Sequence, residues 1–495
     1  MKRTCIIISA ILIVSTGLFA QNADDALRYS QIFYQGTARY RAMGGAFTAL
    51  GGDLSSISLN PAGTGVFRSS EFSFTPQLFY NYKSSSWNST TASAFKYTFN
   101  LSQIGIVSNI ISNGNDKGLV SLNLAYSFNR TNDFNEDLIL SGISNNSSMA
   151  DYWVNESNGL TKLQIPNDAW AANQTGLIDT ITGSNTLYGT IFSFYGDNAS
   201  STYGQKIRRE ITNIGFTGEH AFSIGVNYSN KYFFGATIGI NTLKYTGHLE
   251  HLENDVDNVV FDFKNFTYTD HLEATGIGYS LNLGTIIKPV EFLRIGLALH
   301  SPTVYRISET YFDDITSAFD KKINNVDTYE YSNNPTPYKY TLTTPFRANA
   351  GVAFQIRKIA MISADYEFVD YRLAQFSKAI DNLSYSAENS NIRDTYKAAS
   401  NLRLGAEVRL SNIYLRGGYS YYGKVYKPNE DNKDLVYNSV SLGIGMRQQN
   451  FYVDLASSAQ YSTSNYFMYY DPPYLAPSII KSAKIAFSAT MGFKF

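Results

Sequence analysis

The sequence predicts an all-β protein, a 14-stranded antiparallel transmembrane β-barrel with a short N-terminal hatch of helical turns that plugs the lumen. Three observations predict this fold. The chain begins like an export signal, it contains fourteen segments in which large apolar residues alternate with small or polar ones, and the connections between these segments are alternately short and long. Together they are typical of bacterial outer-membrane barrels.

Residues 1–20 have the order of a secretory signal peptide. Lys2 and Arg3 precede an apolar run from Cys5 to Val14, and small residues lead to the expected cleavage after Ala20. The run is too short to span a membrane as a helix. Because cleavage also removes Cys5, the one cysteine of the chain, we expect the exported protein to fold without disulfides.

Charge and motifs exclude several classes of protein. The chain has 40 lysines and arginines against 41 aspartates and glutamates, so no basic surface for nucleic acid is indicated. Motifs of serine hydrolases, zinc proteases and P-loop enzymes are absent from the sequence. We therefore expect no enzymatic activity, no cofactor and no metal.

Period-two alternation is the main structural signal. In Val120–Phe128 every even residue is large and apolar, as expected when successive side chains point to opposite faces of a sheet. The fourteen segments with this pattern are Phe72–Tyr82, Phe95–Leu101, Val120–Phe128, Phe222–Tyr228, Tyr232–Ile240, Ile277–Leu283, Leu293–Leu299, Phe346–Ile356, Ile362–Phe368, Leu402–Leu410, Ile413–Tyr421, Val440–Met446, Phe451–Leu455 and Ala483–Phe495.

A soluble β-sandwich alternates in the same way and is the alternative fold. Its second face would need apolar residues, whereas Leu402–Leu410 offers Arg403, Gly405, Glu407 and Arg409 there. A lumen facing water accepts such residues. The barrel is the better interpretation.

The connections also predict which end of the barrel faces the periplasm. Tight turns are expected at Ser229-Asn230, Arg357-Lys358, Ser411-Asn412 and Gln449-Asn450, and long connections at 131–210, 247–271, 301–337, 372–399 and 462–480. Short periplasmic turns and long outer loops are usual in these barrels. We expect 131–210 to form a long extracellular loop of the barrel domain, residues 70–495.

The last strand supports the same interpretation. Met491, Phe493 and Phe495 share the outward phase, so the chain ends on a phenylalanine that faces lipid. This ending resembles the terminal aromatic signal through which the barrel-assembly machinery recognises its clients. We expect that machinery and outer-membrane lipid as partners.

Residues 21–69 do not alternate and are rich in glycine. Asp53 can start a short helical turn over Leu54–Ser58, and Pro61 forces the chain to break after Asn60. Small residues allow a backbone to approach its surroundings closely. Because wide barrels are commonly plugged by a folded segment, we expect residues 21–69 to form a hatch inside the lumen.

The stretch RAMGGAFTALGGDLSSISLNPAG, followed by fourteen amphipathic strands, resembles the FadL/TodX family of outer-membrane transporters of long-chain fatty acids and other hydrophobic compounds. The family's hatch carries an Asn-Pro-Ala motif, matched by Asn60, Pro61 and Ala62. The resemblance implies passive uptake of hydrophobic small molecules and their lateral release past the hatch. Secretion-system adaptors that shuttle exported proteins also resemble this family and are the alternative.

The inward phase and the hatch provide candidate site residues. Large side chains that either line a ligand path or pack the hatch are Phe47, Leu54, Ile57, Phe67, Phe79, Phe233, Met361, Tyr414 and Tyr452. Arg347 and Arg403 are candidate anchors for a carboxylate ligand. The apolar residues change from odd to even positions at Ser102 and Gln103, and this change of phase predicts a β-bulge and a candidate lateral gate. The run from His248 to Asp257 is expected to be a solvated charged loop rather than a metal site.

Overall fold

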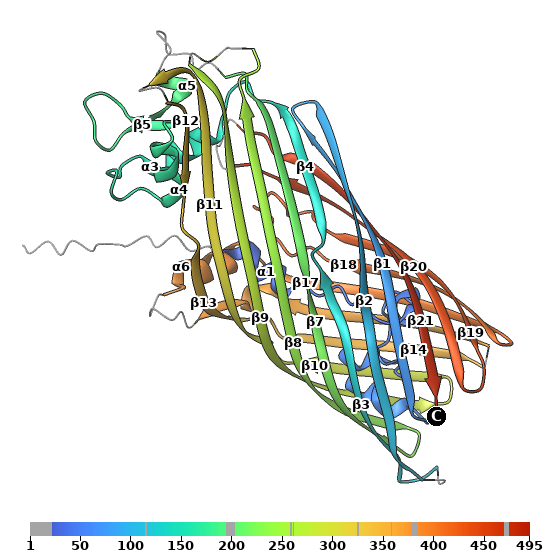
Figure 1. Ribbon diagram of the computed structural model, residues 1–495. Coiled ribbons are helices and arrows are strands. Elements are labelled where there is room, and N and C mark those ends of the chain that lie inside the picture. Colours follow the sequence, from blue (N-terminus) through green and yellow to red (C-terminus); the bar gives the residue numbers. More distant parts are fainter. Residues whose placement is uncertain are drawn as a thin grey trace, which may run out of the picture.

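The computed structural model describes residues 22–113, 116–194, 203–257, 260, 262–323, 326–357, 359–377, 384–469 and 475–495, and the expected signal peptide lies outside these ranges. Its main feature is a closed antiparallel β-barrel with a folded N-terminal segment inside it (Figure 1). The prediction of a fourteen-stranded barrel is confirmed.

Most wall strands are single elements, and a few are interrupted. The wall consists of β1 (Glu71–Trp87), β2 (Thr90–Ser112), β3 (Leu119–Asp133) continued by β4 (Glu136–Ile143), β7 (Lys206–Tyr228), β8 (Tyr232–Asn254), β9 (Phe263–Val290), β10 (Leu293–His300) continued by β11 (Val304–Ile323), β12 (Val326–Ser332) and β13 (Thr336–Thr343) continued by β14 (Arg347–Ile356), β15 (Ala360–Asp370) with β16 (Gln375–Ser377), β17 (Ala398–Leu410), β18 (Ile413–Tyr422), β19 (Tyr437–Arg447), β20 (Phe451–Tyr466) and β21 (Ser478–Lys494).

The remaining elements are short. They are α1 (Ala23–Ser30), α2 (Ala38–Ala42), η1 (Ser56–Ser58), η2 (Pro61–Val66), α3 (Met149–Ser157), α4 (Asn167–Gln174), β5 (Ile178–Thr180), β6 (Tyr188–Thr190), α5 (Ile191–Phe194), η3 (Tyr371–Leu373) and α6 (Ser386–Thr395). The turn expected over Leu54–Ser58 is shorter: Asp53 accepts a hydrogen bond from the backbone N–H of Ser55, and helical geometry begins at Ser56.

Each wall strand pairs with its neighbour along the chain, and β1 pairs with β21 to close the ring. Two neighbouring interruptions fall at proline: Ser301-Pro302-Thr303 separates β10 from β11, and Thr344-Pro345-Phe346 separates β13 from β14. Proline cannot donate a hydrogen bond to a neighbouring strand, so the ladder stops there. The two breaks lie side by side, because β10 pairs with β14 and β11 with β13.

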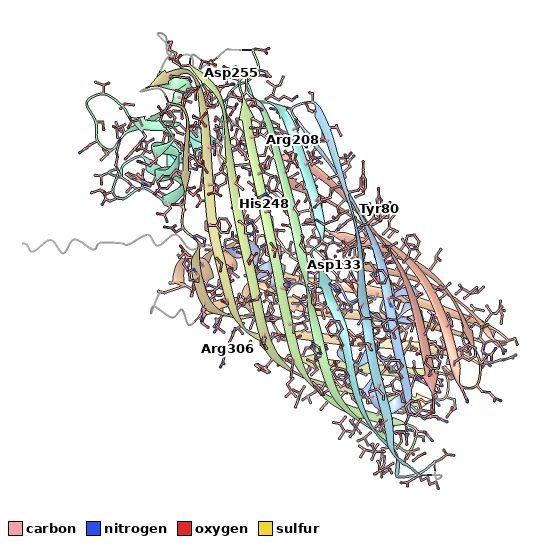
Figure 2. All side chains as sticks on the ribbon, in the orientation of Figure 1. Tyr80, Asp133, Arg208, His248, Asp255 and Arg306 are labelled. Atoms are coloured by element: carbon pink, nitrogen blue, oxygen red, sulfur yellow. The ribbon has the colours of Figure 1, made fainter. Side chains whose placement is uncertain are left out.

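The two faces of the wall have opposite chemistry. Large apolar side chains on the outer face are exposed, for example Phe99 (75%) and Leu442 (66%), and the inward positions are mostly buried polar residues such as Asn123, Thr237 and Ser441. An apolar exterior and a polar interior are expected of a barrel that stands in lipid. Side chains cover both faces along the whole wall (Figure 2).

The strands extend further than alternation predicts. Residues 131–133 and 136–143 belong to β3 and β4, and 206–210 to β7, so the long connection is 144–205. The expectation of a solvated charged loop at 248–257 is wrong for its first part: β8 continues to Asn254, and His251 and Glu253 are fully buried beneath α3, where Glu253 accepts hydrogen bonds from the backbone N–H of Met149 and the hydroxyl of Ser148. This burial could not be predicted from residues 248–257 themselves, because α3, which covers them, is distant in the sequence.

The N-terminal segment (residues 22–69) rests on a ring of wall glycines. Gly225, Gly235 and Gly284 pair in register across β7, β8 and β9, Gly296 pairs with Gly351, and Gly405 pairs with Gly418. A Cβ on Gly235 would overlap the backbone of Pro61, and one on Gly418 would overlap Met43 and Gly44. Glycine is required at these positions because main chain lies directly against main chain.

Adjacent glycines of β18 test this contact. We expect Gly418→Ala to lift the N-terminal segment from the wall, because the added methyl group has no space there. Gly417→Ala is the matched control, since its nearest neighbour would be 3.8 Å away. Limited proteolysis should cut residues 22–69 faster in Gly418→Ala alone. Equal cleavage of both variants would contradict the tight contact.

Candidate transport site

A cavity of about 1320 Å³ occupies the lumen on one side of the N-terminal segment. Its floor includes Arg41, Gly44 and Gly45 of that segment, and its far end reaches Met149 and Asp168 of the connection 144–205. The volume exceeds that of ordinary small-molecule pockets, about 300–1,000 Å³. It can therefore accommodate a long or bulky ligand.

Asn60 joins the N-terminal segment to the wall. Its side-chain N–H group donates to the carbonyl oxygens of Thr48, 2.6 Å away, and Thr285, 3.2 Å away, while its Oδ1 accepts from the backbone N–H of Ala62 at 3.1 Å. The residue is completely buried. Pro61 and Ala62 then begin η2, so the Asn-Pro-Ala motif closes one turn and fixes it against β9.

Arg39 links the same segment to the opposite side of the barrel. Its guanidinium lies 3.0 Å from the Glu407 carboxylate, which also pairs with Arg416 at 2.6 Å. Arg416 pairs in turn with Asp454 at 2.6 Å. These charges are buried, and removal of one partner from such a chain typically costs about 3–5 kcal/mol. The network therefore holds residues 22–69 in one position.

Two charged groups of the segment titrate abnormally because they are buried. Burial raises the pKa of the Asp53 carboxyl, although Arg39 opposes the change. Burial lowers the pKa of Arg41 to about 10. Arg41 donates to the Ser458 hydroxyl at 2.9 Å, and no carboxylate lies within ion-pair distance of it among the described residues.

The predicted bulge in β2 is present. Thr75 pairs with Gln103 and Pro76 with Leu101, so Ser102 is the extra residue. The Ser102 hydroxyl donates to the carbonyl of Gly36 and accepts from the backbone N–H of the same residue. The bulge thus contacts the N-terminal segment directly.

The ladder between β2 and β3 ends at this bulge. Below it, residues from Gln103 to Ser112 pair with β3. Before the bulge in the sequence, Thr90–Leu101 pair with β1 along one edge of β2. Within the described residues, the edge of this part of β2 that would face β3 forms no backbone ladder. Unpaired backbone edges are costly in lipid, so an interruption of the wall here indicates a seam.

β4 covers the seam from the inside. β4 pairs with β7, and β1 directs Asn81 and Ser85 onto the carbonyl oxygens of Asn135 and Ile139, each at 2.6 Å. Two ion pairs add to these contacts, Lys83 with Glu136 at 2.7 Å and Lys96 with Asp137 at 2.6 Å. The junction of β3 and β4 lies near the middle of the wall, at Asp133 (Figure 2). Polar contacts rather than a backbone ladder therefore hold this part of the wall.

The large side chains predicted to line a ligand path fall into three groups. Phe79 lines the large cavity. Phe67, Met361 and Tyr452 line a smaller cavity of about 280 Å³ on the other side of the N-terminal segment.

The other members of that set pack rather than line. Phe47 contacts Tyr40 within the segment, Leu54 and Ile57 pack against the wall, and Phe233 packs against Ala62. Tyr414 lies among Arg409, Arg416 and Arg447. The structure brings these five residues to the interface between the segment and the wall, or to its charged surroundings, and not to either cavity.

Both candidate anchors already have a carboxylate partner. Arg347 and Arg403 pair with the two oxygens of Glu367 at 3.0 and 2.8 Å, and Arg347 also donates to the carbonyl of Ser30. Arg403 faces the large cavity, whereas Arg347 does not line it. Sequence reasoning missed Arg41, which reaches the cavity from the N-terminal segment. Arg41 lies outside the alternating strands, so the inward phase of the strands does not indicate it.

A closed barrel with an internal segment, a large lumen cavity and a lateral seam defines a transport protein of the outer membrane. The family model for "Outer membrane protein transport protein (OMPP1/FadL/TodX)" matches residues 180–436, just over half of the chain. The chain belongs to this family, as its sequence predicts. Within the described residues, helices are too short or too polar to cross a membrane.

Solved structures agree in fold. The toluene transporter TodX of Pseudomonas putida is 12% identical, with a TM-score of 0.53 over 93% of this chain and 98% of that one. A FadL homologue from Pseudomonas aeruginosa is 12% identical, with a TM-score of 0.55 over 94% of this chain and 100% of that one. A search of curated proteins found no match. The protein-shuttle alternative is not favoured.

The Asn-Pro-Ala turn provides a test of the internal segment. We expect Asn60→Ala to destabilise the segment by about 1–3 kcal/mol, because two buried carbonyl oxygens and one N–H lose their partner. Hydrogen exchange of residues 48–66 should accelerate, while heat-modifiable migration of the barrel stays normal.

Asn230→Ala, in the turn between β7 and β8, serves as the control for this variant. Unchanged exchange in Asn60→Ala would show that the motif does not hold the segment.

Proposed function

We propose that the protein is a passive channel for hydrophobic compounds, which enter the lumen cavity and leave through the seam between β2 and β4. Residues 22–69 act as a hatch that blocks the straight route along the barrel axis. TodX is described as a toluene transporter, and a channel with 12% identity and a TM-score of 0.50, CymD, as a monoaromatic hydrocarbon channel. Monoaromatic or long-chain apolar compounds are accordingly the first substrates to test.

The observation that carries this proposal is the interrupted ladder above Ser102. A compound that leaves sideways enters lipid without crossing water, and each methylene kept out of water is worth about 0.8 kcal/mol. The outer side of the seam is correspondingly apolar, with Phe95, Tyr97 and Phe99 exposed on β2. Residues Glu136 and Leu138 of β4 line the cavity on its inner side.

Release then requires β4 to move. Asp137 and Glu136 pair with Lys96 and Lys83 across the seam, and their side chains are 14–33% exposed. Solvent therefore screens these pairs in part, and each contributes on the order of 1 kcal/mol. Their separation is therefore compatible with passive exit. Phe79, Arg41 and Lys484 lie together beside this route, since both cations face the Phe79 ring.

Two further parts of the proposal concern biogenesis. The carboxyl-terminal Phe495 is 71% exposed and β21 pairs with β1, an arrangement that suits recognition by the barrel-assembly machinery before closure. The order of turns and loops suits an orientation with the tight turns in the periplasm. Both remain predictions from sequence.

Removal of the bulge tests lateral release. Deletion of Ser102 joins the outward Leu101 to the inward Gln103 and so restores continuous alternation through β2. We expect uptake of a labelled long-chain fatty acid and of toluene to fall to the level of cells without the protein.

Ser102→Ala keeps the extra residue and is the matched control. It should retain uptake at equal surface abundance. If the deletion variant assembles and transports like the wild type, release does not occur at this seam.

A further inference from the structure

One wall of the lumen cavity is made of small hydrogen-bonding side chains. We call it the serine wall: Ser439 of β19, Gln460, Ser462 and Ser464 of β20, and Ser482 of β21 all line the cavity. Ser439 is directly opposite Gln460, and Ser462 is directly opposite Ser482. Neighbouring strands lie about 4.8 Å apart and alternate residues about 6.8 Å apart, so these groups form a regular grid.

The serine wall has no hydrogen-bond partners among the described residues. Neighbouring lumen hydroxyls are used to hold the N-terminal segment: Ser441 donates to the carbonyl of Ala42, and Ser420 donates to that of Gly44. The five side chains of the serine wall make no hydrogen bond to residues 22–69, and they are partly exposed. Their donors and acceptors are therefore available to a ligand.

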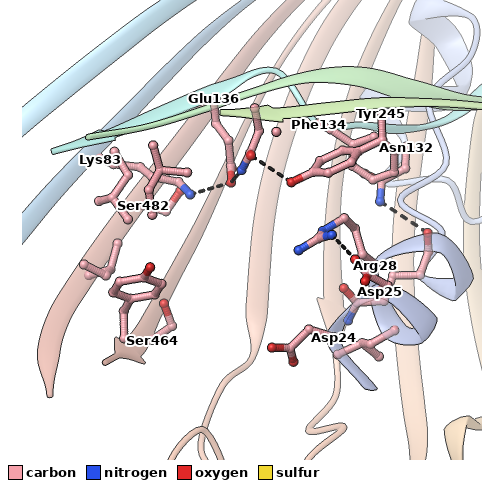
Figure 3. A pocket seen from close by; sticks show the side chains of 18 of the residues that line it. Asp24, Asp25, Arg28, Lys83, Asn132, Phe134, Glu136, Tyr245, Ser464 and Ser482 are labelled. Atoms are coloured by element: carbon pink, nitrogen blue, oxygen red, sulfur yellow. Dashed lines mark hydrogen bonds and ion pairs between the residues drawn. The ribbon is translucent and has the colours of Figure 1, made fainter. Parts of the chain in front are cut away.

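The opposite wall is aromatic. Tyr245, Tyr268 and Tyr311 line the cavity from β8, β9 and β11. In the fourteen-stranded ring, β9 and β11 lie about halfway around from β20, so the tyrosines face the serine wall across the lumen. In the close view of the cavity, Ser464 and Ser482 lie on one side and Tyr245 lies with Arg28 on another (Figure 3).

These two walls suit a ligand with different chemistry from a hydrocarbon. A purely apolar compound would displace water from the serine wall without replacing its hydrogen bonds, which costs affinity. A ring that carries several hydroxyl groups replaces them. Cavity-lining charges are of both signs, such as Arg28 paired with Asp25, and so favour neither an anionic nor a cationic head group.

We propose that the preferred ligands are neutral amphiphiles with a polyhydroxylated head group, such as a sugar attached to an alkyl chain. This inference rests on the proposed channel function and specifies its substrate class. The head group binds along the serine wall, and the alkyl chain extends toward Phe79 and the seam.

Binding of ligands that share one alkyl chain tests the proposal. The full chain, in nanodiscs of phosphatidylcholine, is titrated by calorimetry with octyl glucoside below its micellar concentration, with 1-octanol, with octanoate and with free glucose. We expect octyl glucoside to bind about ten-fold more tightly than 1-octanol or octanoate, because two or more hydroxyl groups are satisfied. Free glucose should bind more weakly than octyl glucoside.

The variant that removes three hydroxyl groups of the serine wall combines Ser439→Ala, Ser462→Ala and Ser482→Ala. It should reduce the preference for octyl glucoside over 1-octanol to about two-fold or less. The matched control combines Ser457→Ala and Thr463→Val, which lie on the outward face of β20. It should keep the preference of the wild type.

Three results would overturn the inference. Octyl glucoside that binds no more tightly than 1-octanol means that the serine wall is merely hydrated, and the channel for apolar compounds stands. Glucose that binds as tightly as octyl glucoside identifies a soluble sugar rather than an amphiphile. If none of the four compounds binds, the proposed function fails together with the substrate class.

Discussion

The close contact between two backbones, that of the N-terminal segment and that of the barrel wall, is the constraint on which the rest of the structure depends. It exists because glycines of neighbouring strands fall in register around much of the ring, so that Pro61 and Met43 touch strands with no side chain between them. A barrel of this width cannot be filled by its own wall residues. The segment fills one end of the lumen and leaves the large cavity of about 1320 Å³ on its other side.

Ionic and polar contacts then select one position of the segment. Apolar packing against glycine is not directional, so it does not fix one orientation. The ion pair of Arg39 with Glu407 and the hydrogen bond from Asn60 to the carbonyl of Thr285 form in only one orientation of the segment. Buried ion pairs contribute little net stability but penalise every arrangement that separates them. Glu407 is shared between Arg39 and Arg416, so the wall network and the internal segment form one unit.

The seam follows from a single extra residue. Ser102 puts β2 out of register with a straight ladder to β3, and its hydroxyl uses the freed geometry to bind Gly36. Below the bulge the wall is an ordinary hydrogen-bonded sheet, and above it side-chain contacts to β4 replace the ladder. Side-chain contacts open at lower cost than a ladder of backbone hydrogen bonds in lipid. The wall is therefore easier to open at this seam, which lies beside the cavity, than at a continuous backbone ladder.

The sequence by itself determined the barrel, its fourteen strands and the bulge, because alternation along a strand is a local property that lipid outside and water inside impose on every segment. The position of the Asn-Pro-Ala turn ahead of β1 was equally readable, since proline acts on the residue beside it. The strand ends could not be predicted from the sequence. β8 and β9 continue beyond the apolar belt and run under α3, and there apolar and polar residues no longer alternate regularly.

Only the tertiary structure decided what each inward side chain does. Phe79 lines the cavity while Phe233, of the same phase and chemistry, packs under Ala62, and the difference lies in which part of residues 22–69 stands opposite. The two candidate anchors share Glu367 because β15 pairs with both β14 and β17, a neighbour relation fixed by the closed ring. Ser439, Ser462 and Ser482 form one surface for the same reason: a period of two places each on the lumen side, and only strand register brings them together.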